Sequence, residues 1–369
     1  MEEISLIYLN LDRRVFRYRA GGYTHLKGIG RGLSKYLKIS LLSWSSCKKN
    51  EKDFVSCNKD FSTAFFGSLL SLTFVLLTTR ERNFLIRKCP ASLVIFPLVK
   101  FARLLFLKRT IGILEVNGIA GDYSKHSWLK KGLALLLHRS SLRFFNVFYC
   151  VNESLAERLI DGFHIESSRV VVCRNGGFPS KVESYQVLSG ERLESICLVY
   201  FGANQQHYDI SGVLECCDSL ISTLGIDIKV VLVGNGFELF RERYSFVEST
   251  GWLTLENLRS YLAGMDIKLF GLLPLVDSSN TAASDIEPIK TFDYASLALP
   301  VIHSEVCLAS HLSKDCFISY TDLSDLAAVL VRLSEISQEE YFSMRTSSVR
   351  FSVSTSWEER LKPLAKLVN

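Results

Sequence analysis

Residues 285–302 read DIEPIKTFDYASLALPVI and decide the fold, because a polar cluster, a helix start and an apolar strand follow one another there. Pro288 suits the first turn of a helix, where its missing N–H costs nothing, and Asp285 is placed to cap that turn. The apolar run at residues 300–303 then predicts a buried strand. This order of elements is typical of the edge of a ligand pocket in an α/β protein.

The predicted helix carries a polar face. Lys290, Asp293 and Tyr294 stand three and four residues apart on one side of it. Ile289 and Phe292 are expected to point toward a core. A lysine at a helix N-terminus suits a phosphate, and a carboxylate one turn further in suits the hydroxyls of a ribose or hexose. A Lys–Asp pair on a solvated helix face explains the same spacing, so both interpretations stay open on this segment alone.

Short runs rich in Ile, Val, Leu and Phe alternate along the whole chain with longer segments of helical period. The first set lies at residues 4–9, 38–43, 111–116, 147–151 and 170–173, and the second at 196–201, 228–233, 266–270, 300–303 and 316–320. Such alternation is expected of parallel sheets wrapped by helices. We therefore predict an α/β protein with two Rossmann-like doubly wound domains facing across a cleft.

The length of 369 residues exceeds what one hydrophobic core usually supports, which also favours two domains. Gly176 and Gly177 open a polar stretch that runs through Glu191, so we expect the linker at residues 180–194. The predicted domains are 1–185 and 186–350. Residues 351–369 are expected to form a helix that crosses back to the first domain.

Composition excludes some classes of protein. The net charge is only +5, with 43 basic residues scattered among 38 acidic ones, so no nucleic-acid partner is expected. The ten cysteines are irregularly spaced and several sit in apolar runs, as in a reduced cytoplasmic protein. We expect no zinc site, because no Cys-x-x-Cys spacing occurs, and no signal peptide, because the chain opens Met-Glu-Glu. Residues 61–79 lack charges, and a buried helix is favoured there over a membrane-spanning one.

Several strand ends carry polar or glycine residues. Gly21 and Gly22 follow the first strand, and paired glycines allow close backbone approach to a ligand, although a plain turn explains them equally well. Glu115 and Asn117 end a later strand. Gly234 stands at the same position after a strand of the second half. These ends are expected to meet at one edge of each sheet, where ligands bind.

Longer pieces of sequence occur in a characteristic order: GG at 21–22, EVNG at 115–118, VNES at 151–154, RNGG at 174–177, YFG at 200–202, VGNG at 233–236, GWL at 251–253 and PIKTFDYA at 288–295. SWE at 356–358 then opens the terminal segment. In this order the chain resembles the GT-B glycosyltransferases, in particular the large retaining family 4. The resemblance spans nearly the whole chain, and its most specific part is the stretch from Pro288 to Ile302.

The resemblance implies roles for the acidic and basic residues of that stretch. The family has two acidic residues separated by seven positions at its donor site, and Asp285 and Asp293 hold that spacing. Asp293 would bind ribose hydroxyls. Asp285 would lie near the donor sugar, with Glu287 able to replace it. Lys290 would neutralise the diphosphate as the glycosidic bond breaks, without a metal cofactor.

The remaining site residues follow from the same resemblance. The donor is expected to contact Gly202, Asn204, His207, Gly234, Trp252, Leu253 and Ile289, besides Lys290 and Asp293; the acceptor or phosphate side is expected at Gly21, Gly22, Glu115, Asn117 and His126. Two departures matter. Residues 203–212 contain no arginine or lysine, where the family often has both for the diphosphate. Asn117-Gly118 replaces a frequent histidine. His126 is the nearest substitute, but the interpretation as a surface histidine is favoured over that role.

These residues predict transfer of a sugar from a nucleotide-sugar donor to a glycan or lipid-linked saccharide, with retention and without metal, in cell-surface polysaccharide biosynthesis. A catalytically weak or inactive partner subunit that binds nucleotide sugar stays open as the alternative, and so does other chemistry on this fold, such as epimerisation. We expect a cytoplasmic location. Residues 98–109 and 127–139 mix an apolar face with Lys and Arg, which suits either peripheral contact with the inner membrane surface or core helices with basic ends.

Overall fold

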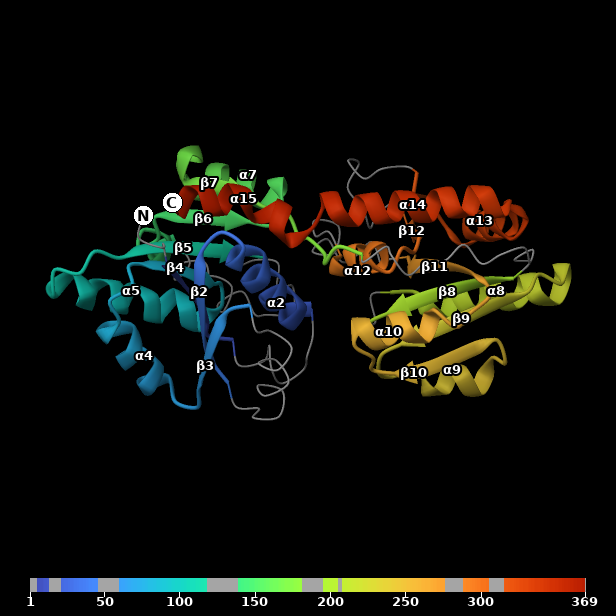
Figure 1. Cartoon of the computed structure of the whole chain (residues 1–369), viewed down its shortest axis with the longest axis horizontal. Coiled ribbons are helices and arrows are strands. Elements are labelled where there is room, and N and C mark those ends of the chain that lie inside the picture. Colours follow the sequence, from blue (N-terminus) through green and yellow to red (C-terminus); the bar gives the residue numbers. More distant parts are fainter. Residues whose placement is uncertain are drawn as a thin grey trace. The chain divides into compact units, whose positions relative to one another are not determined.

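The computed structural model describes residues 5–12, 21–45, 60–117, 139–180, 195–204, 208–275, 288–304 and 315–368, and of Gly21 and Gly22 it describes the backbone alone. The chain divides into two compact units (Figure 1). Unit 1 comprises Met1–Gly176 and Trp357–Asn369, and unit 2 comprises Gly177–Ser356. The domain boundary predicted at residue 185 lies outside the described residues and stays a prediction.

Unit 1 contains a parallel seven-stranded sheet of order β3-β2-β1-β4-β5-β6-β7. Its strands are β1 (Ser5–Asn10), β2 (Lys38–Trp44), β3 (Ser62–Phe66), β4 (Asn83–Arg87), β5 (Ile111–Val116), β6 (Val147–Cys150) and β7 (Val170–Val172). The chain leaves β1 toward β2 on one side and returns to pair β4 on the other. The point where the strand order reverses therefore lies between β1 and β4, and a doubly wound sheet binds ligands at such a point.

The helices of unit 1 are α2 (Gly21–Ser34), α4 (Leu69–Thr78), α5 (Pro90–Leu105), α7 (Glu153–Phe163) and α15 (Trp357–Val368), with a 3-10 turn η1 (Ser167–Arg169). The last helix, α15, packs on α2. Glycines permit this contact, since a Cβ at Gly28 would stand 2.1 Å from Trp357 and one at Gly32 would stand 2.7 Å from Leu361. The glycine-rich stretch that starts at Gly21 is thus a helix rather than a turn, and part of it serves helix packing.

Unit 2 contains a parallel six-stranded sheet of order β10-β9-β8-β11-β12-β13, which reverses between β8 and β11. Its strands are β8 (Ile196–Phe201), β9 (Ile228–Val233), β10 (Val247–Gly251), β11 (Lys268–Leu273), β12 (Val301–Ser304) and β13 (Phe317–Tyr320). Its helices are α8 (Ile210–Leu224), α9 (Glu238–Arg243), α10 (Leu255–Leu262), α12 (Ile289–Ser296), α13 (Leu323–Glu335) and α14 (Gln338–Ser354). Residues 351–354, predicted as the start of the terminal helix, belong to α14.

Two apolar clusters lie on opposite faces of the unit 2 sheet. Leu198 and Tyr200 of β8 belong to one cluster, and Cys197 and Val199 belong to the other. Side chains of a strand alternate between faces, so a strand covered by helices on both sides is apolar throughout. This is why the central strands were readable as continuous apolar runs, and it leaves only their ends for polar chemistry.

All ten strands predicted from apolar runs are present, and the predicted α/β fold class is confirmed. Three further strands, β3, β4 and β10, were not predicted. The buried helix expected at residues 61–79 is wrong, because this segment forms β3 and then the short α4, on which Leu70 and Phe74 are exposed. Within the part of the chain that is described, no helix is both long and apolar enough to cross a bilayer.

Candidate functional site

Two glycines bring the carboxyl ends of β8 and β9 together. The N–H of Gly202 donates to the carbonyl of Val233 at 2.8 Å, and a Cβ at Gly234 would stand 1.9 Å from the carbonyl oxygen of Gly202. Gly202 has φ +151° and Gly234 has φ +149°, a region that favours glycine. Both predicted positions therefore form one tight crossing of backbone at the strand ends of unit 2.

The loops beyond these glycines are tied together by Asn204. Its N–H donates to the carbonyl of Asn235 at 3.2 Å, and its side-chain amide donates to the carbonyl of Gly236 at 3.0 Å. Asn204 is exposed, and in this structure its amide holds the loop. Its predicted donor contact stays a prediction.

Lys290 lies on two tyrosines beside Gly202. Its Nζ donates to the hydroxyl of Tyr200 at 2.7 Å and stands 4.2 Å from the ring centres of both Tyr200 and Tyr208. A Cβ at Gly202 would stand 2.9 Å from the same Nζ. Burial, with a smaller effect from Tyr208, raises the pKa of Tyr200, so its hydroxyl is neutral beside the ammonium. The two aromatic faces hold this positive charge at the strand ends, next to the N-terminus of α12.

The helix that carries Lys290 differs in two details from the prediction. Pro288 is the N-cap residue of α12 rather than part of its first turn, and it makes no side-chain cap bond. The capping role predicted for Asp285 stays a prediction. Tyr294 does not share a solvated face with Lys290. Its fully buried hydroxyl accepts from the N–H of Phe201 at 2.9 Å and donates to the carbonyl of Leu272 at 3.0 Å. Tyr294 is thus a core residue that fixes α12 against β8 and β11.

Other predicted residues of α12 lie as follows. Ile289, the first residue of the helix, is half-buried, and Phe292 is fully buried, as expected of a residue that faces a core. Asp293 is 7% exposed. The remaining acidic candidates, Asp285 and Glu287, lie outside the described residues.

Trp252 follows β10 at the same edge of the sheet. Its ring stands 5.8 Å from the ring of Phe201 and is 40% exposed, while Leu253 is half-buried against the core. The N–H of Gly234 donates to the carbonyl of Gly251 at 2.9 Å, which ties the tryptophan loop to the glycine crossing. An exposed indole of this kind offers a face on which a planar base can stack.

A hollow of about 590 Å³ lies next to this loop. Its lining residues are Glu238, Arg241 and Glu242 of α9 and Ser249, Thr250 and Gly251 of β10. Gly251 lines the hollow and also accepts the hydrogen bond from the N–H of Gly234, so the hollow adjoins the glycine crossing. His207, the last predicted donor residue, lies outside the described residues.

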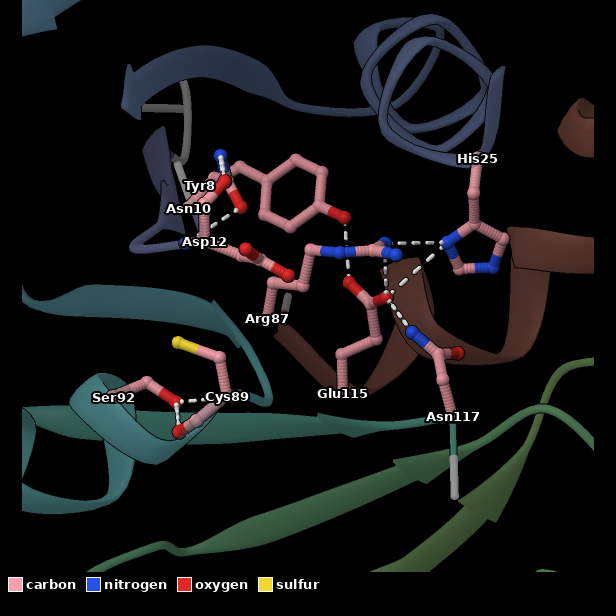
Figure 2. Close-up of polar contacts among 9 residues, drawn as sticks. All are labelled: Tyr8, Asn10, Asp12, His25, Arg87, Cys89, Ser92, Glu115 and Asn117. Carbon is pink, nitrogen blue, oxygen red and sulfur yellow. Dashed lines mark hydrogen bonds and ion pairs between the residues drawn. The ribbon is translucent and has the colours of Figure 1, made fainter. Parts of the chain in front are cut away.

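A buried ionic network occupies the corresponding edge of unit 1 (Figure 2). Glu115 of β5 is fully buried, and its Oε1 accepts from Nη1 of Arg87 at 2.9 Å while its Oε2 accepts from the hydroxyl of Tyr8 at 2.5 Å. Nδ1 of His25 stands 3.2 Å from Oε1 of Glu115 and 3.0 Å from Nη1 of Arg87, and Asn117 donates to Oε1 of Glu115. The residues come from β1, β4, β5 and α2, so they bridge the point where the strand order reverses.

The charges of this network compensate one another. Burial would raise the pKa of Glu115, but Arg87 and His25, with hydrogen bonds from His25 and Tyr8, lower that pKa to about 2. Burial, reinforced by the Glu115 charge, raises the pKa of Tyr8, which keeps its hydroxyl protonated and able to donate. The carboxylate is therefore ionised and fully hydrogen-bonded, an arrangement that orients its neighbours rather than exchanging protons.

His25 was not predicted as a site residue. It is 3% exposed, and its Nε2 is buried without a hydrogen-bond partner among the described residues. Tyr8 and Arg87 were also missed. The only sequence signal for this set is position, since Arg87 is the last residue of β4 and Glu115 the fifth of β5.

The other acceptor-side candidates are placed only in part. The backbones of Gly21 and Gly22 start α2, the helix that carries His25. His126 lies outside the described residues. Within the described ranges, no group of three or more His, Cys, Asp or Glu side chains could hold a metal ion.

Known structures share this architecture. The pneumococcal O-GlcNAc transferase GtfA, in complex with UDP and GlcNAc, is similar to the chain at a TM-score of 0.69 and 9% identity, covering 100% of this chain and 99% of GtfA. The lipopolysaccharide outer core galactosyltransferase WaaB matches at 0.63 and 12% identity, covering 98% of this chain and 100% of WaaB. A glycosyltransferase from Rickettsia africae ESF-5 matches at 0.64 and 12% identity, covering 100% and 98%.

These likenesses confirm the predicted fold. The chain has the GT-B fold of the glycosyltransferases, with two sheets of seven and six parallel strands. No family model and no curated protein matches the sequence. At identities of 9% to 13% the structural likeness establishes the fold and leaves the reaction to be argued from the site.

Proposed function

We propose that the chain is a glycosyltransferase that takes a sugar from a nucleotide-sugar donor. The observation that carries the proposal is the edge of unit 2, where the backbone crosses without side chains at Gly202 and Gly234 and Lys290 adds one positive charge beside this crossing. Glycines permit the close approach of a diphosphate, and a cation at a helix N-terminus neutralises it. Both features suit a nucleoside diphosphate leaving group.

On this proposal each part of the edge has a role. Lys290 and the first N–H groups of α12 hold the diphosphate, and Trp252 supports the base. Asp293 binds the ribose, and Asp285 or Glu287 lies near the donor sugar. The bond from the anomeric carbon to the phosphate oxygen breaks, a bond to the acceptor oxygen forms with retention, and the acceptor proton passes to the departing phosphate. Charge on the leaving group is met by Lys290, so the proposal needs no metal cofactor.

We assign the acceptor side to unit 1. There Glu115 and Asn117 stand at the strand ends, with His25 beside them. A saccharide or lipid-linked saccharide is the proposed acceptor, and cell-surface polysaccharide synthesis in the cytoplasm the proposed setting. In support, WaaB and WaaG, which share the fold, are described as lipopolysaccharide glycosyltransferases.

A thermal-shift panel of UDP, GDP, ADP and CMP sugars tests the donor site. One nucleotide sugar, at about 100 times its Kd, should raise the Tm of the wild type by about 5 °C or more. Lys290→Ala and Asp293→Ala should each reduce that shift. Lys229→Ala is the matched control, because Lys229 pairs with Glu248 on the surface of the same unit, away from the glycine crossing. If no nucleotide sugar stabilises the wild type, or if both site variants keep the full shift, the donor site is wrong.

One observation favours a second candidate, an inactive partner subunit that binds nucleotide sugar. Residues 203–212 contain no arginine or lysine, and Lys290 already donates to Tyr200. The diphosphate would then have less charge stabilisation than in an efficient transferase. An assay of nucleoside diphosphate release separates the transferase from the partner subunit. It uses the nucleotide sugar that the thermal-shift panel identifies and a mixture of lipid-linked saccharides as acceptors. Release that Lys290→Ala abolishes supports the transferase, whereas a thermal shift without release supports the partner subunit.

A further inference from the structure

Exposed apolar side chains are concentrated on one surface of unit 1. Nine of the fifteen large hydrophobic side chains that are exposed in the described residues belong to α4, α5 and the turn that follows α5. They are Leu70, Phe74, Val94, Leu98, Phe101, Leu104, Leu105, Phe106 and Leu107. We call this set the α4–α5 face. Exposed apolar side chains concentrated on two packed helices mark an interaction site.

The helix α5 is apolar on two sides. Leu93, Phe96 and Val99 are buried against the core, while Leu98 and Phe101 on the other side are 64% and 58% exposed. Exposed residues recur along that side at 94, 98, 101 and 105, the spacing of a helical stripe. A helix that is apolar all round is normally covered, either by protein or by lipid.

The face is held in place by a buried arginine. Arg103 of α5 is 1% exposed, and its guanidinium donates to the carbonyls of Leu76, Thr79 and Glu81 at 2.8, 3.0 and 2.6 Å, and to the hydroxyl of Thr110 at 2.9 Å. These carbonyls include the C-terminal end of α4, which packs on α5 (Figure 1). The arginine satisfies groups that the helix leaves unpaired. The exposed leucines and phenylalanines therefore stand on a fixed two-helix support.

The turn after α5 projects leucine into solvent. Leu107 has φ +55° and is 93% exposed, and its neighbours Leu105 and Phe106 are 68% and 74% exposed. A left-handed backbone at a leucine costs about 1 kcal/mol or more. The turn closes α5, because the N–H of Leu107 donates to the carbonyl of Leu104 and the N–H of Lys108 to the carbonyl of Arg103, each at 2.9 Å. Its three large apolar side chains project outward, and the described part of the chain leaves them exposed.

Positive charge surrounds this turn. A hollow of about 450 Å³ is lined by Lys100, Leu104, Lys108, Arg109, Thr110, Ile111, Asn146, Val147 and Leu367. Lys100 Nζ donates to the carbonyl of Phe144 at 2.6 Å and to Asn146 Oδ1 at 2.8 Å, and Lys108 Nζ donates to the carbonyl of Leu77 at 3.1 Å. Among the described residues, these two ammonium groups contact neutral oxygens and pair with no carboxylate. Between Glu81 and Glu115 the sequence has no acidic residue.

We propose that the α4–α5 face docks on an anionic lipid bilayer, with the leucine turn and the α5 stripe in the acyl region and lipid phosphates at Lys100, Lys108 and Arg109. An anionic surface complements both the apolar side chains and the basic rim. A second copy of the chain fits less well. In a two-fold contact the face would meet itself, so its basic residues would face basic residues with no acidic partner.

The docking surface is separate from the candidate acceptor site. Arg109 precedes β5, whereas Glu115 lies near the carboxyl end of that strand, so the two stand at opposite edges of the sheet. Six residues of strand span roughly 20 Å. Lipid binding can therefore be measured without nucleotide or acceptor, and its outcome is independent of the proposed donor site.

Vesicle co-sedimentation of the full chain tests the proposal. Vesicles of phosphatidylcholine containing phosphatidylglycerol should pellet the wild type, and added salt should weaken the binding. Vesicles of phosphatidylcholine alone should pellet much less. The triple variant Leu98→Ser, Phe101→Ser, Leu105→Ser should bind at least about 100-fold more weakly. Each substitution removes an apolar side chain whose transfer into the acyl region strengthens binding roughly tenfold or more. Arg109→Gln should weaken binding about fivefold and reduce the salt dependence.

The control is the double variant Leu224→Ser, Leu239→Ser, which removes two leucines of unit 2 that are 60% and 78% exposed. It should bind vesicles like the wild type. The proposal is overturned if the triple variant pellets as well as the wild type, or if the wild type ignores anionic vesicles. Light scattering completes the test by measuring the oligomeric state. If the wild type is a dimer, the triple variant is a monomer and neither binds vesicles, the face is a contact with a second copy and the proposal is wrong.

Discussion

At the carboxyl ends of its strands unit 1 carries buried charges, whereas unit 2 carries glycines there. Glu115 of unit 1 is fully buried and bonded to Arg87 and Tyr8. In unit 2, Gly202 and Gly234 bring bare backbone together beside Lys290. The two sheets share a topology, so the difference lies in the side chains at their edges alone.

This contrast separates two ways of using one position. A network of paired charges fixes the shape of its surroundings, because each charge is held by its partners. A glycine crossing works differently, since it removes side chains and lets a ligand approach the backbone beside one cation. We infer that the strand ends of unit 1 orient an acceptor surface, whereas the strand ends of unit 2 bind an anion.

The largest effect is expected from breaking the network. Glu115→Gln should lower the free energy of unfolding of unit 1 by about 3 to 5 kcal/mol, because Arg87 would stay buried without its counter-charge. Urea denaturation followed by circular dichroism measures it. Glu153→Gln is the matched control, since Glu153 pairs with Arg174 on the surface and its loss should cost less than about 1 kcal/mol. Equal, small effects of the two substitutions would remove the contrast between the units.

Acid should act on the same group. The pKa of Glu115 is about 2 in the folded chain and lies near 4.3 in an unfolded one, so between these values the unfolded chain binds more protons. Its contribution of about 3 kcal/mol is therefore present above pH 4.3 and lost as the pH falls toward 2. Unfolding curves of the wild type and of Glu115→Gln, recorded across this window, should converge as the pH falls. A constant difference between them would place the charge elsewhere.

A somewhat smaller effect is expected in unit 2. Gly234→Ala should destabilise that unit by about 2 to 3 kcal/mol, because the new Cβ meets the carbonyl of Gly202 and the backbone has φ +149°. Nucleotide binding should weaken with it. Gly264→Ala is the control, since a Cβ there meets nothing within 4 Å, and it should be neutral or slightly stabilising. A neutral Gly234→Ala would show that the crossing is not tight in solution.

The fold was largely predictable, and the reason is burial. β8 and β9 are covered on both faces, so their sequences are continuous apolar runs that stand out from the helices between them. β4 was missed because its apolar core, Phe84 to Ile86, is only three residues long and lies between Arg82 and Arg87. Missing that strand also hid Arg87 as a strand-end residue.

The two edges differed in how much of them could be predicted. Gly202, Gly234 and Lys290 were named from sequence, because glycines after strands and a lysine at a helix start are local signals, and the structure brings these three together. The partners of Glu115 could not be found this way. Tyr8, His25 and Arg87 lie far from it in sequence, and only the pairing of β1, β4 and β5 sets them side by side. Local patterns carry no information on such contacts.

The central claim is that Lys290 binds the β-phosphate of a nucleotide at the edge of unit 2. Calorimetric titration of the nucleoside diphosphate and monophosphate, with the base that the thermal-shift panel selects, into wild type and Lys290→Ala tests it most directly. The wild type should prefer the diphosphate by about 10- to 100-fold, from a charge-assisted contact of roughly 1.5 to 3 kcal/mol, and Lys290→Ala should lose most of that preference. The same preference in both proteins would contradict the claim.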